Sequence, residues 1–517
     1  MKKYLMLTLA LCTVCLVQLQ QLHSATTPQA EQHHPVSTRN PEAQSFFDQG
    51  LTLVYAFNSD AAVRAFQQAA QFDPHLAMAY WGIALALGPG ITRIPAPAES
   101  NAAYLAIQKA LSLAPTTDNE RAYIEALAKR YSSSSQADAH QLAVNYKHAM
   151  GELVKRYPND LDAATLYAES AMDLRPWQLW SKDGQPAQGT EEIVTVLESV
   201  LKQTPGHLGA NHYYIHAVEA SRHPERALAS AQRLSKLRVM PAAGHLVHMP
   251  AHIYMRIGDY AAAAQSNADA IALDQVYINS RGGNAAGTFY PHNLNFLVAA
   301  YSMEGRLVDA LKAAAQLEKL GIPDMPTATF ALVRFHQWAD ILNLPQPRSE
   351  ELESTLAWHY ARGMALAATN RIEDAASELK SLNELGKRFD NPNQILKISQ
   401  SVLGARVAQS RGDRQSAINL LKEAVNIQDS LDYSEPPSWY FPVRESLGGA
   451  LMVNGNYQAA EAVFCTDLVQ NPHSGRSLFG LLESLKAQGK QSKAQGIQNQ
   501  FKAAWSKADI QLHVEDL

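Results

Sequence analysis

The stretch that decides the fold is GLTLVYAFNSDAAVRAFQQAAQFDP, residues 50–74. A small residue, an alanine, an aromatic, a second alanine and a proline stand at offsets 0, 12, 16, 19 and 24: Gly50, Ala62, Phe66, Ala69 and Pro74. Small residues let paired helices approach closely, and the proline ends the second helix. The stretch therefore predicts a hairpin of two α-helices.

The same offsets recur later in the chain. One copy consists of Gly448, Ala460, Phe464 and Pro472, with Asp467 at the fourth place. Looser copies begin near Gly363 and Ala405. The pattern resembles that of the tetratricopeptide (TPR) superfamily over most of residues 43–510. The resemblance implies an all-α, TPR-like helical-hairpin solenoid (a superhelix) of about ten hairpins.

The composition is that of an ordinary soluble protein. The chain has 517 residues, 46% of them hydrophobic and 18% charged, and helical periodicity runs almost throughout without a convincing alternating strand. The formal charge is −5, and no long block of Lys or Arg offers a footprint for phosphates. We therefore expect no nucleic-acid partner.

Residues 1–25 have the features of a signal peptide: a basic start, an apolar run over 4–17 and small residues at the end. They predict an exported, periplasmic protein with no membrane anchor after cleavage. Cys12 and Cys15 lie inside this leader, so Cys465 alone remains and no intramolecular disulfide is expected.

We divide the chain into five segments. They are a signal peptide (1–25), a flexible linker (26–42), N-terminal TPR-like repeats (43–157), central histidine-rich repeats (158–320) and C-terminal TPR-like repeats (321–510). His33 and His34, in the linker, are expected to be a solvated pair.

Histidines are concentrated in the central repeats. Eight of the 18 histidines fall in the 88 residues from Pro205 to His292. Those at helical spacing are His212 with His216, His248 with His252, and His245 with His248. Residues three or four apart share one face of a helix, which is the reason to suspect a metal site.

Numbering each first helix within a 34-residue unit places the histidines in register, with units starting near Leu208, Gly244 and Pro291. Position 5 then holds His212 and His248, position 9 holds His216 and His252, and position 2 holds His245 and His292. A unit that begins near Leu161 places Glu169 at position 9 as well. The TPR resemblance implies that these positions line the concave groove. Neighbouring helices pack about 8–10 Å apart, so imidazoles from adjacent units can converge on one ion.

Repeated imidazoles with a carboxylate suit a transition metal ion: Cu, Zn, Ni or Fe. The predicted metal ligands are His212, His216, His245, His248, His252, His292, Glu169 and Glu219. Six imidazoles exceed one tetrahedral site, so either two ions bind or some histidines act from a second shell.

Two other interpretations stay open. The histidines could hydrogen-bond a peptide or protein ligand in the same groove without metal, or simply satisfy one another between repeats. No HExxH or GxSxG motif is present, so whether the protein is an enzyme is undecided. If it is, metal-activated water or metal redox chemistry is expected.

The segment that includes NHYYIHAVE (211–219) and GHLVHMPAHIY (244–254), with EPPSWYFP (435–442) later, also resembles a group of exported bacterial TPR proteins. That resemblance implies architecture and no activity. Pro250, inside the expected first helix of its unit, either kinks that helix or starts it.

Overall fold

The computed structural model describes residues 32–113, 117–134, 136–322, 326–348, 351–388, 393–439 and 441–517. Over these ranges the regular elements are helices and no β-strand forms, so the predicted all-α helical-hairpin solenoid is confirmed. The predicted signal peptide lies outside the described residues. None of the described helices has the length and apolar character needed to cross a membrane.

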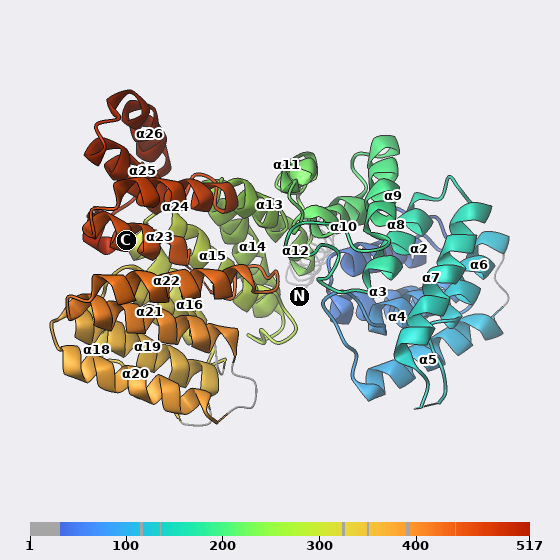
Figure 1. The fold of residues 1–517 in the computed structure, drawn as a ribbon. Helices are drawn as coiled ribbons and strands as arrows, with labels where there is room; N and C mark the ends of the chain where they lie inside the picture. The colour runs from blue at the N-terminus through green and yellow to red at the C-terminus, as the bar shows by residue number, and fades with distance from the viewer. Residues whose placement is uncertain are drawn as a thin grey trace, which may run out of the picture.

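Consecutive helices pack against one another along the chain (Figure 1). The first part contains α2 (Pro41–Tyr55), α3 (Ser59–Phe72), α4 (Ala77–Leu87), α5 (Pro97–Ser112), α6 (Asp118–Ala128), α7 (Ala139–Arg156), α8 (Leu161–Met172) and α9 (Thr190–Gln203). The middle contains α10 (Leu208–Val218), η1 (Pro224–Ala227), α11 (Leu228–Leu234), η2 (Pro241–Ala243), α12 (His245–His248), α13 (Pro250–Ile257), α14 (Tyr260–Ser280), α15 (Tyr290–Met303) and α16 (Leu307–Glu318).

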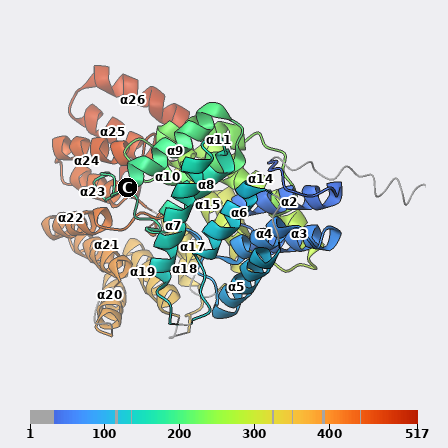
Figure 2. The same ribbon diagram turned by 90° about the vertical axis from the view of Figure 1, so that its right-hand side faces the viewer.

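The last part contains α17 (Thr327–Arg334), α18 (Trp338–Leu342), α19 (Leu352–Ala368), α20 (Ile372–Gly386), α21 (Gln394–Ser410), α22 (Arg414–Asp429), α23 (Val443–Val453), α24 (Tyr457–Gln470), α25 (Gly475–Ala487), α26 (Gln491–Ala504) and η3 (Val514–Asp516). Helices α3 to α5 and helices α25 and α26 lie on opposite sides of the molecule in both views (Figures 1 and 2). The middle helices, drawn in green to yellow, lie between them.

The repeated glycine and phenylalanine explain how the hairpins stack. Phe66 of α3 lies between α2 and α4: a Cβ added to Gly50 would stand 2.6 Å from its Cε1, and one added to Gly82 would stand 2.4 Å from its Cδ1. Only glycine leaves room for the ring at both places. The second copy repeats this arrangement with Gly448, Phe464 and Gly480. The spacing that predicted a hairpin therefore also joins each hairpin to the next.

The buried apolar side chains form two clusters. One runs from Ala43 to Ala331 and the other from Phe330 to Ala494, so the two meet at α17. The central histidines lie on helices of the first cluster. Helix α10 also contacts α2, which brings the first hairpin against the histidine-rich repeats.

Pro250 starts a helix. Helix α12 ends at His248, and Pro250 stands in the first turn of α13, where its missing N–H costs no hydrogen bond. Of the two alternatives, a kinked helix or a helix that begins at Pro250, the structure therefore shows the latter. His245 and His248 lie on the short α12, and His252 lies on α13.

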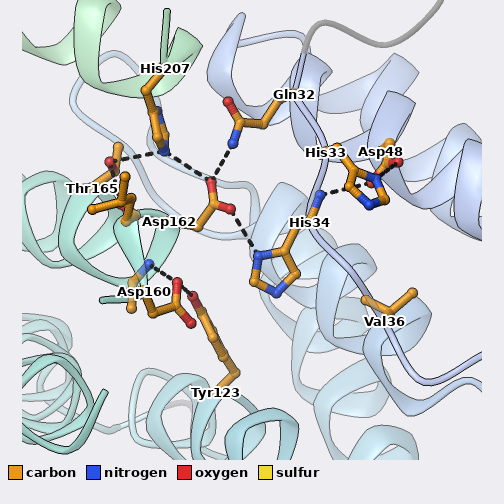
Figure 3. Close-up of polar contacts among 12 residues, drawn as sticks. Gln32, His33, His34, Val36, Asp48, Tyr123, Asp160, Asp162, Thr165 and His207 are labelled. Atoms are coloured by element: carbon orange, nitrogen blue, oxygen red, sulfur yellow. Dashed lines mark hydrogen bonds and ion pairs between the residues drawn. The ribbon is translucent and has the colours of Figure 1, made fainter. Parts of the chain in front are cut away.

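Of the predicted linker (26–42), residues 32–40 run along the first helices and residues 41 and 42 already belong to α2. His34 was expected to be solvated, but it is not. Its Nδ1 lies 2.9 Å from Asp162 Oδ2 on α8 (Figure 3). Asp162 also lies 3.2 Å from Nε2 of His207, and this buried carboxylate raises the pKa of His34 against the lowering effect of burial. The prediction for His34 was wrong because Asp162 lies far away in sequence.

Candidate metal centre

Four helices bring all six predicted histidines together. The histidines are His212 and His216 of α10, His245 and His248 of α12, His252 of α13 and His292 of α15. All are buried except His292, which is partly exposed. Their ring nitrogens form two groups of three, within each of which the potential ligand atoms lie within 4.8 Å of one another. We call His212, His216 and His245 the first trio and His248, His252 and His292 the second trio.

Two of the rings are held by neutral hydrogen-bond acceptors. Nδ1 of His212 lies 2.6 Å from the backbone oxygen of Tyr55, at the end of α2. Nδ1 of His248 lies 2.7 Å from Oδ1 of Asn267, whose Nδ2 donates to Ala263 O. Because these oxygens only accept, the proton is on Nδ1 in both rings and the Nε2 atoms carry lone pairs.

Glu219 holds one ring from each trio. Its Oε1 lies 2.7 Å from Nδ1 of His216, and its Oε2 lies 2.5 Å from Nδ1 of His252. Burial opposes ionisation of Glu219, but the two histidines outweigh it and lower its pKa, so it is a carboxylate. It therefore accepts from both Nδ1 atoms, as carboxylates do behind metal-bound histidines, and leaves both Nε2 atoms free.

The second trio contains nitrogen atoms that face each other. Nε2 of His248 lies 2.9 Å from Nε2 of His252, and Nε2 of His292 lies 3.1 Å from Nε2 of His248. With Nδ1 protonated in His248 and His252, two lone pairs would meet across 2.9 Å unless a proton or a metal ion lies between them. Metal–nitrogen bonds of about 2.0–2.1 Å in a tetrahedral site put neighbouring nitrogens about 3.3 Å apart. The observed spacings are close to that value.

The first trio contains buried nitrogens without a hydrogen-bond partner among the described residues. They are Nε2 of His212, Nε2 of His216 and both ring nitrogens of His245. Burial and the neighbouring histidines lower the pKa of His245 well below its usual value, and the same causes act on His212. Buried polar atoms are almost always hydrogen-bonded, so this group of neutral, unpaired nitrogens is exceptional.

Aromatic rings enclose the trios. Phe57 lies with its ring centroid 4.4 Å from that of His212, and Phe289 stacks on His245 at 3.9 Å. Trp177 meets the ring of His216 edge-on at 5.6 Å. Phe57 and Trp177 have positive φ angles of 55° and 62°, a conformation that bulky residues rarely adopt and that is concentrated at functional sites.

A loop from the C-terminal repeats covers the centre. Tyr433 donates from its hydroxyl to Glu435 Oε1 at 2.8 Å and contacts Glu219 Oε2 at 3.2 Å. Burial raises the pKa of Glu435 to about 7. The aromatic, proline-containing motif that starts at Glu435 was the only sequence signal for this loop, and nothing in the sequence pointed to Tyr433, Tyr55 or Asn267.

A pocket opens beside the first trio. Its walls are Ile91, Met172, Arg175, Trp177, Leu179, Trp180 and Ala220, and it reaches His216, Glu219 and Tyr433. With about 20 Å³ of free space, the pocket has room for about one water molecule. It reaches the first trio at His216.

Glu169 does not join the imidazoles. It is buried on α8 and forms no group of ligand atoms with any of the six histidines. Its neighbours are Asp173 and Arg130, which form an ion pair with each other. Burial, with the charge of Asp173, raises the pKa of Glu169 well above its usual value. The register placed Glu169 at the same helix position as His216 and His252, but its carboxyl group lies beside Asp173 and Arg130 and not beside the imidazoles.

The predicted ligand Glu219 forms a third group of potential ligand atoms with His216 and His252. A fourth cluster, His34 with Asp160 and Asp162, is internally paired (Figure 3). Asp162 accepts from the Tyr55 hydroxyl at 2.7 Å as well as contacting His34 and His207, and Asp160 accepts from Tyr123 at 2.8 Å. Because these carboxylates already have donors, this cluster anchors residues 32–40 and offers no free ligand set.

No protein-family model matches the chain, and no curated protein matches it either. Among solved structures, it is similar to the TPR domain of P58(IPK), a crystal structure at 2.5 Å. The two chains are 14% identical, the match covers 87% of this chain and 99% of that one, and the TM-score is 0.20. So low a score carries no weight, and the TPR-like description therefore rests on the hairpins and their glycine–phenylalanine packing.

Proposed function

We propose that this TPR-like protein binds transition metal ions through the Nε2 atoms of its six central histidines. One observation carries the proposal: Nε2 of His212, Nε2 of His216 and both ring nitrogens of His245 are buried together without a hydrogen-bond partner among the described residues. In the second trio, a proton on Nε2 of His252, whose pKa Glu219 raises, would satisfy the 2.9 Å contact with Nε2 of His248. It would leave the buried nitrogens of the first trio unpaired, whereas metal ions satisfy both trios.

The ligand set suits copper, zinc or iron. All six donors are imidazoles, and a site of three neutral nitrogens leaves a coordination position for water or a substrate. If the centre is catalytic, its chemistry is that of metal-activated water or metal redox, at this open position. We also propose that the protein is exported to the periplasm, and following the cleavage of residues 1–25 would test this.

The first experiment is elemental analysis of the full chain, purified without a histidine tag or added metal. We expect Cu, Zn or Fe in the wild-type protein and its loss when His212, His216, His248 and His252 are all changed to Ala, with helicity retained. The matched control changes four exposed histidines, His75, His140, His148 and His223, and should keep the metal. A wild-type protein with no metal and no uptake at micromolar free ion would overturn the proposal.

The alternative is a binding module for a peptide or protein. The TPR-like scaffold supports a protein-binding role, and Trp177, an exposed aromatic side chain beside His216, favours it. Under this alternative, the four-histidine variant would lose partner affinity although no ion was ever bound. Comparing metal content and partner capture in the same two variants therefore distinguishes the two functions.

A further inference from the structure

The two trios are built in the same way. In each, positions 5 and 9 of one repeat supply two histidines and position 2 of the next repeat supplies the third. The ring centroids form nearly the same triangle: 4.9, 5.0 and 6.5 Å in the first trio, and 4.9, 4.8 and 6.1 Å in the second. The sequence register and the geometry agree that one three-histidine unit occurs twice.

The two units are in contact. His216 of the first trio and His252 of the second have ring centroids 5.3 Å apart, and His245 and His248 are separated by 5.5 Å. These separations between trios fall within the range of 4.8 to 6.5 Å found inside the trios. Both oxygens of Glu219 are used, one for each trio, so a single carboxylate fixes the two units relative to each other.

We infer that the centre is dinuclear: each trio holds one transition metal ion, and the two ions lie close enough to share a small oxygen ligand. This inference rests on the proposed metal binding and adds the number of ions, their ligands and their coupling. Three protein nitrogens leave each ion an open position, and ions held about 3.5–4 Å apart in two-metal sites share ligands. Hydroxide from solvent is the bridging ligand expected in the resting protein.

The ligand chemistry follows from the donor set. Six neutral imidazoles leave the positive charge of two ions uncompensated except by Glu219, so an anionic oxygen ligand between them is favoured. The pocket walled by Trp177 and Trp180 opens on the first trio. The centre therefore takes small oxygen donors at the bridging position.

The test uses Cu(II) as the probe, added to the metal-free full chain, with bound copper and the integrated electron paramagnetic resonance signal measured together. We expect two coppers per chain and a signal per copper at least several-fold below that of a mononuclear site, because bridged Cu(II) ions couple their spins. The His212→Ala/His245→Ala and His248→Ala/His292→Ala variants each leave one trio intact. Each should bind one copper with its full signal.

The outcomes separate the two proposals. Two coppers with a full signal, or one copper in the wild-type chain, would overturn the dinuclear inference and leave metal binding standing. No bound copper would overturn both. A variant that fails to fold is recognised by lost helicity, and the second one-trio variant then supplies the single-ion reference.

Discussion

In the C-terminal repeats, Arg334 of α17 and Glu445 of α23 form a buried ion pair with two hydrogen bonds, and Ser474 donates to the same carboxylate. Arg476 beside them donates to the backbone oxygens of Arg334 and Asp516. In the central repeats, the equally buried histidines instead direct free nitrogens at one another. Both regions bury polar groups between repeats. In the C-terminal one the terminal guanidinium nitrogens of Arg334 and Arg476 have protein partners, although their Nε atoms have none, whereas in the central one four ring nitrogens of the first trio lie together without a partner among the described residues.

This difference indicates which region is built for a ligand. A buried polar group without a partner destabilises the folded protein by about 1–3 kcal/mol, so a cluster of such groups is expected only where another interaction compensates. In the C-terminal repeats, Arg334 and Glu445 avoid most of this cost because each is the other's partner. In the central repeats, the proposed metal ions would be the partners of the free imidazole nitrogens.

The largest effect that distinguishes the two regions is expected at the C-terminal ion pair. Glu445→Gln leaves the Arg334 guanidinium buried without its counter-charge, and removing one partner of such a pair costs about 3–5 kcal/mol. Urea unfolding should show that loss, while elemental analysis shows unchanged metal content. Loss of the metal from the folded variant would contradict the separation of the two regions.

The next effect is expected at Glu219. The Glu219→Ala change removes the acceptor of Nδ1 in both His216 and His252, and loss of such an outer partner typically lowers metal affinity about 10–100-fold. Because one ring of each trio is released, titration with Cu(II) should show both binding steps weakened. Glu225→Ala, at an exposed carboxylate on η1, is the control and should leave both steps unchanged.

The metal-free protein should lose stability in acid. Burial and neighbouring histidines lower the pKa of His292 to about 3, whereas a histidine in the unfolded chain has a pKa of about 6.5. Between these values the unfolded chain binds the extra proton, so stability is complete above pH 6.5 and falls as the pH drops. From pH 6.5 to 5 the loss from this one group is about 2 kcal/mol.

His212, His245 and His248, whose pKa values are lowered in the same direction, add to that loss. Urea unfolding of the metal-free protein at the two pH values measures it, and His292→Gln should reduce the difference. Equal stability of the metal-free protein at pH 6.5 and pH 5 would show that these imidazoles are not buried in the neutral form.

The smallest effect should be confined to one trio. Asn267→Leu removes the acceptor of His248 Nδ1 without leaving a cavity, and lowers the metal affinity of the second trio alone by about 10–100-fold. The first trio, anchored through the Tyr55 backbone, keeps its affinity. A copper titration that moves from two similar steps to one strong and one weak step would show this, and equal weakening of both steps would contradict it.

The sequence was sufficient to find the six histidines, because helical spacing and repeat register both act through the backbone and need no partner. The same register predicted Glu169 as a ligand. A register position does not determine the neighbours of a side chain, and Glu169 lies beside the Arg130–Asp173 ion pair instead of the histidines. The Nδ1 acceptor Asn267 lies on the second helix of a hairpin, where no metal-ligand spacing marks it.

Contacts across the superhelix could not be predicted either. The Tyr55 carbonyl reaches His212 over 157 positions of sequence, and the Tyr433 hydroxyl reaches Glu219 over 214. Such contacts depend on how many hairpins separate two segments and on how each hairpin turns relative to the last. Repeat spacing in one sequence fixes neither quantity to the precision of a hydrogen bond.

The most direct test is a crystal structure of the metal-loaded full chain, with anomalous diffraction recorded above and below the absorption edge of the bound metal. The account predicts two anomalous peaks, one among the Nε2 atoms of His212, His216 and His245 and the other among those of His248, His252 and His292, with Glu219 behind both. A single peak, or peaks elsewhere such as beside His34 and Asp162, would contradict it.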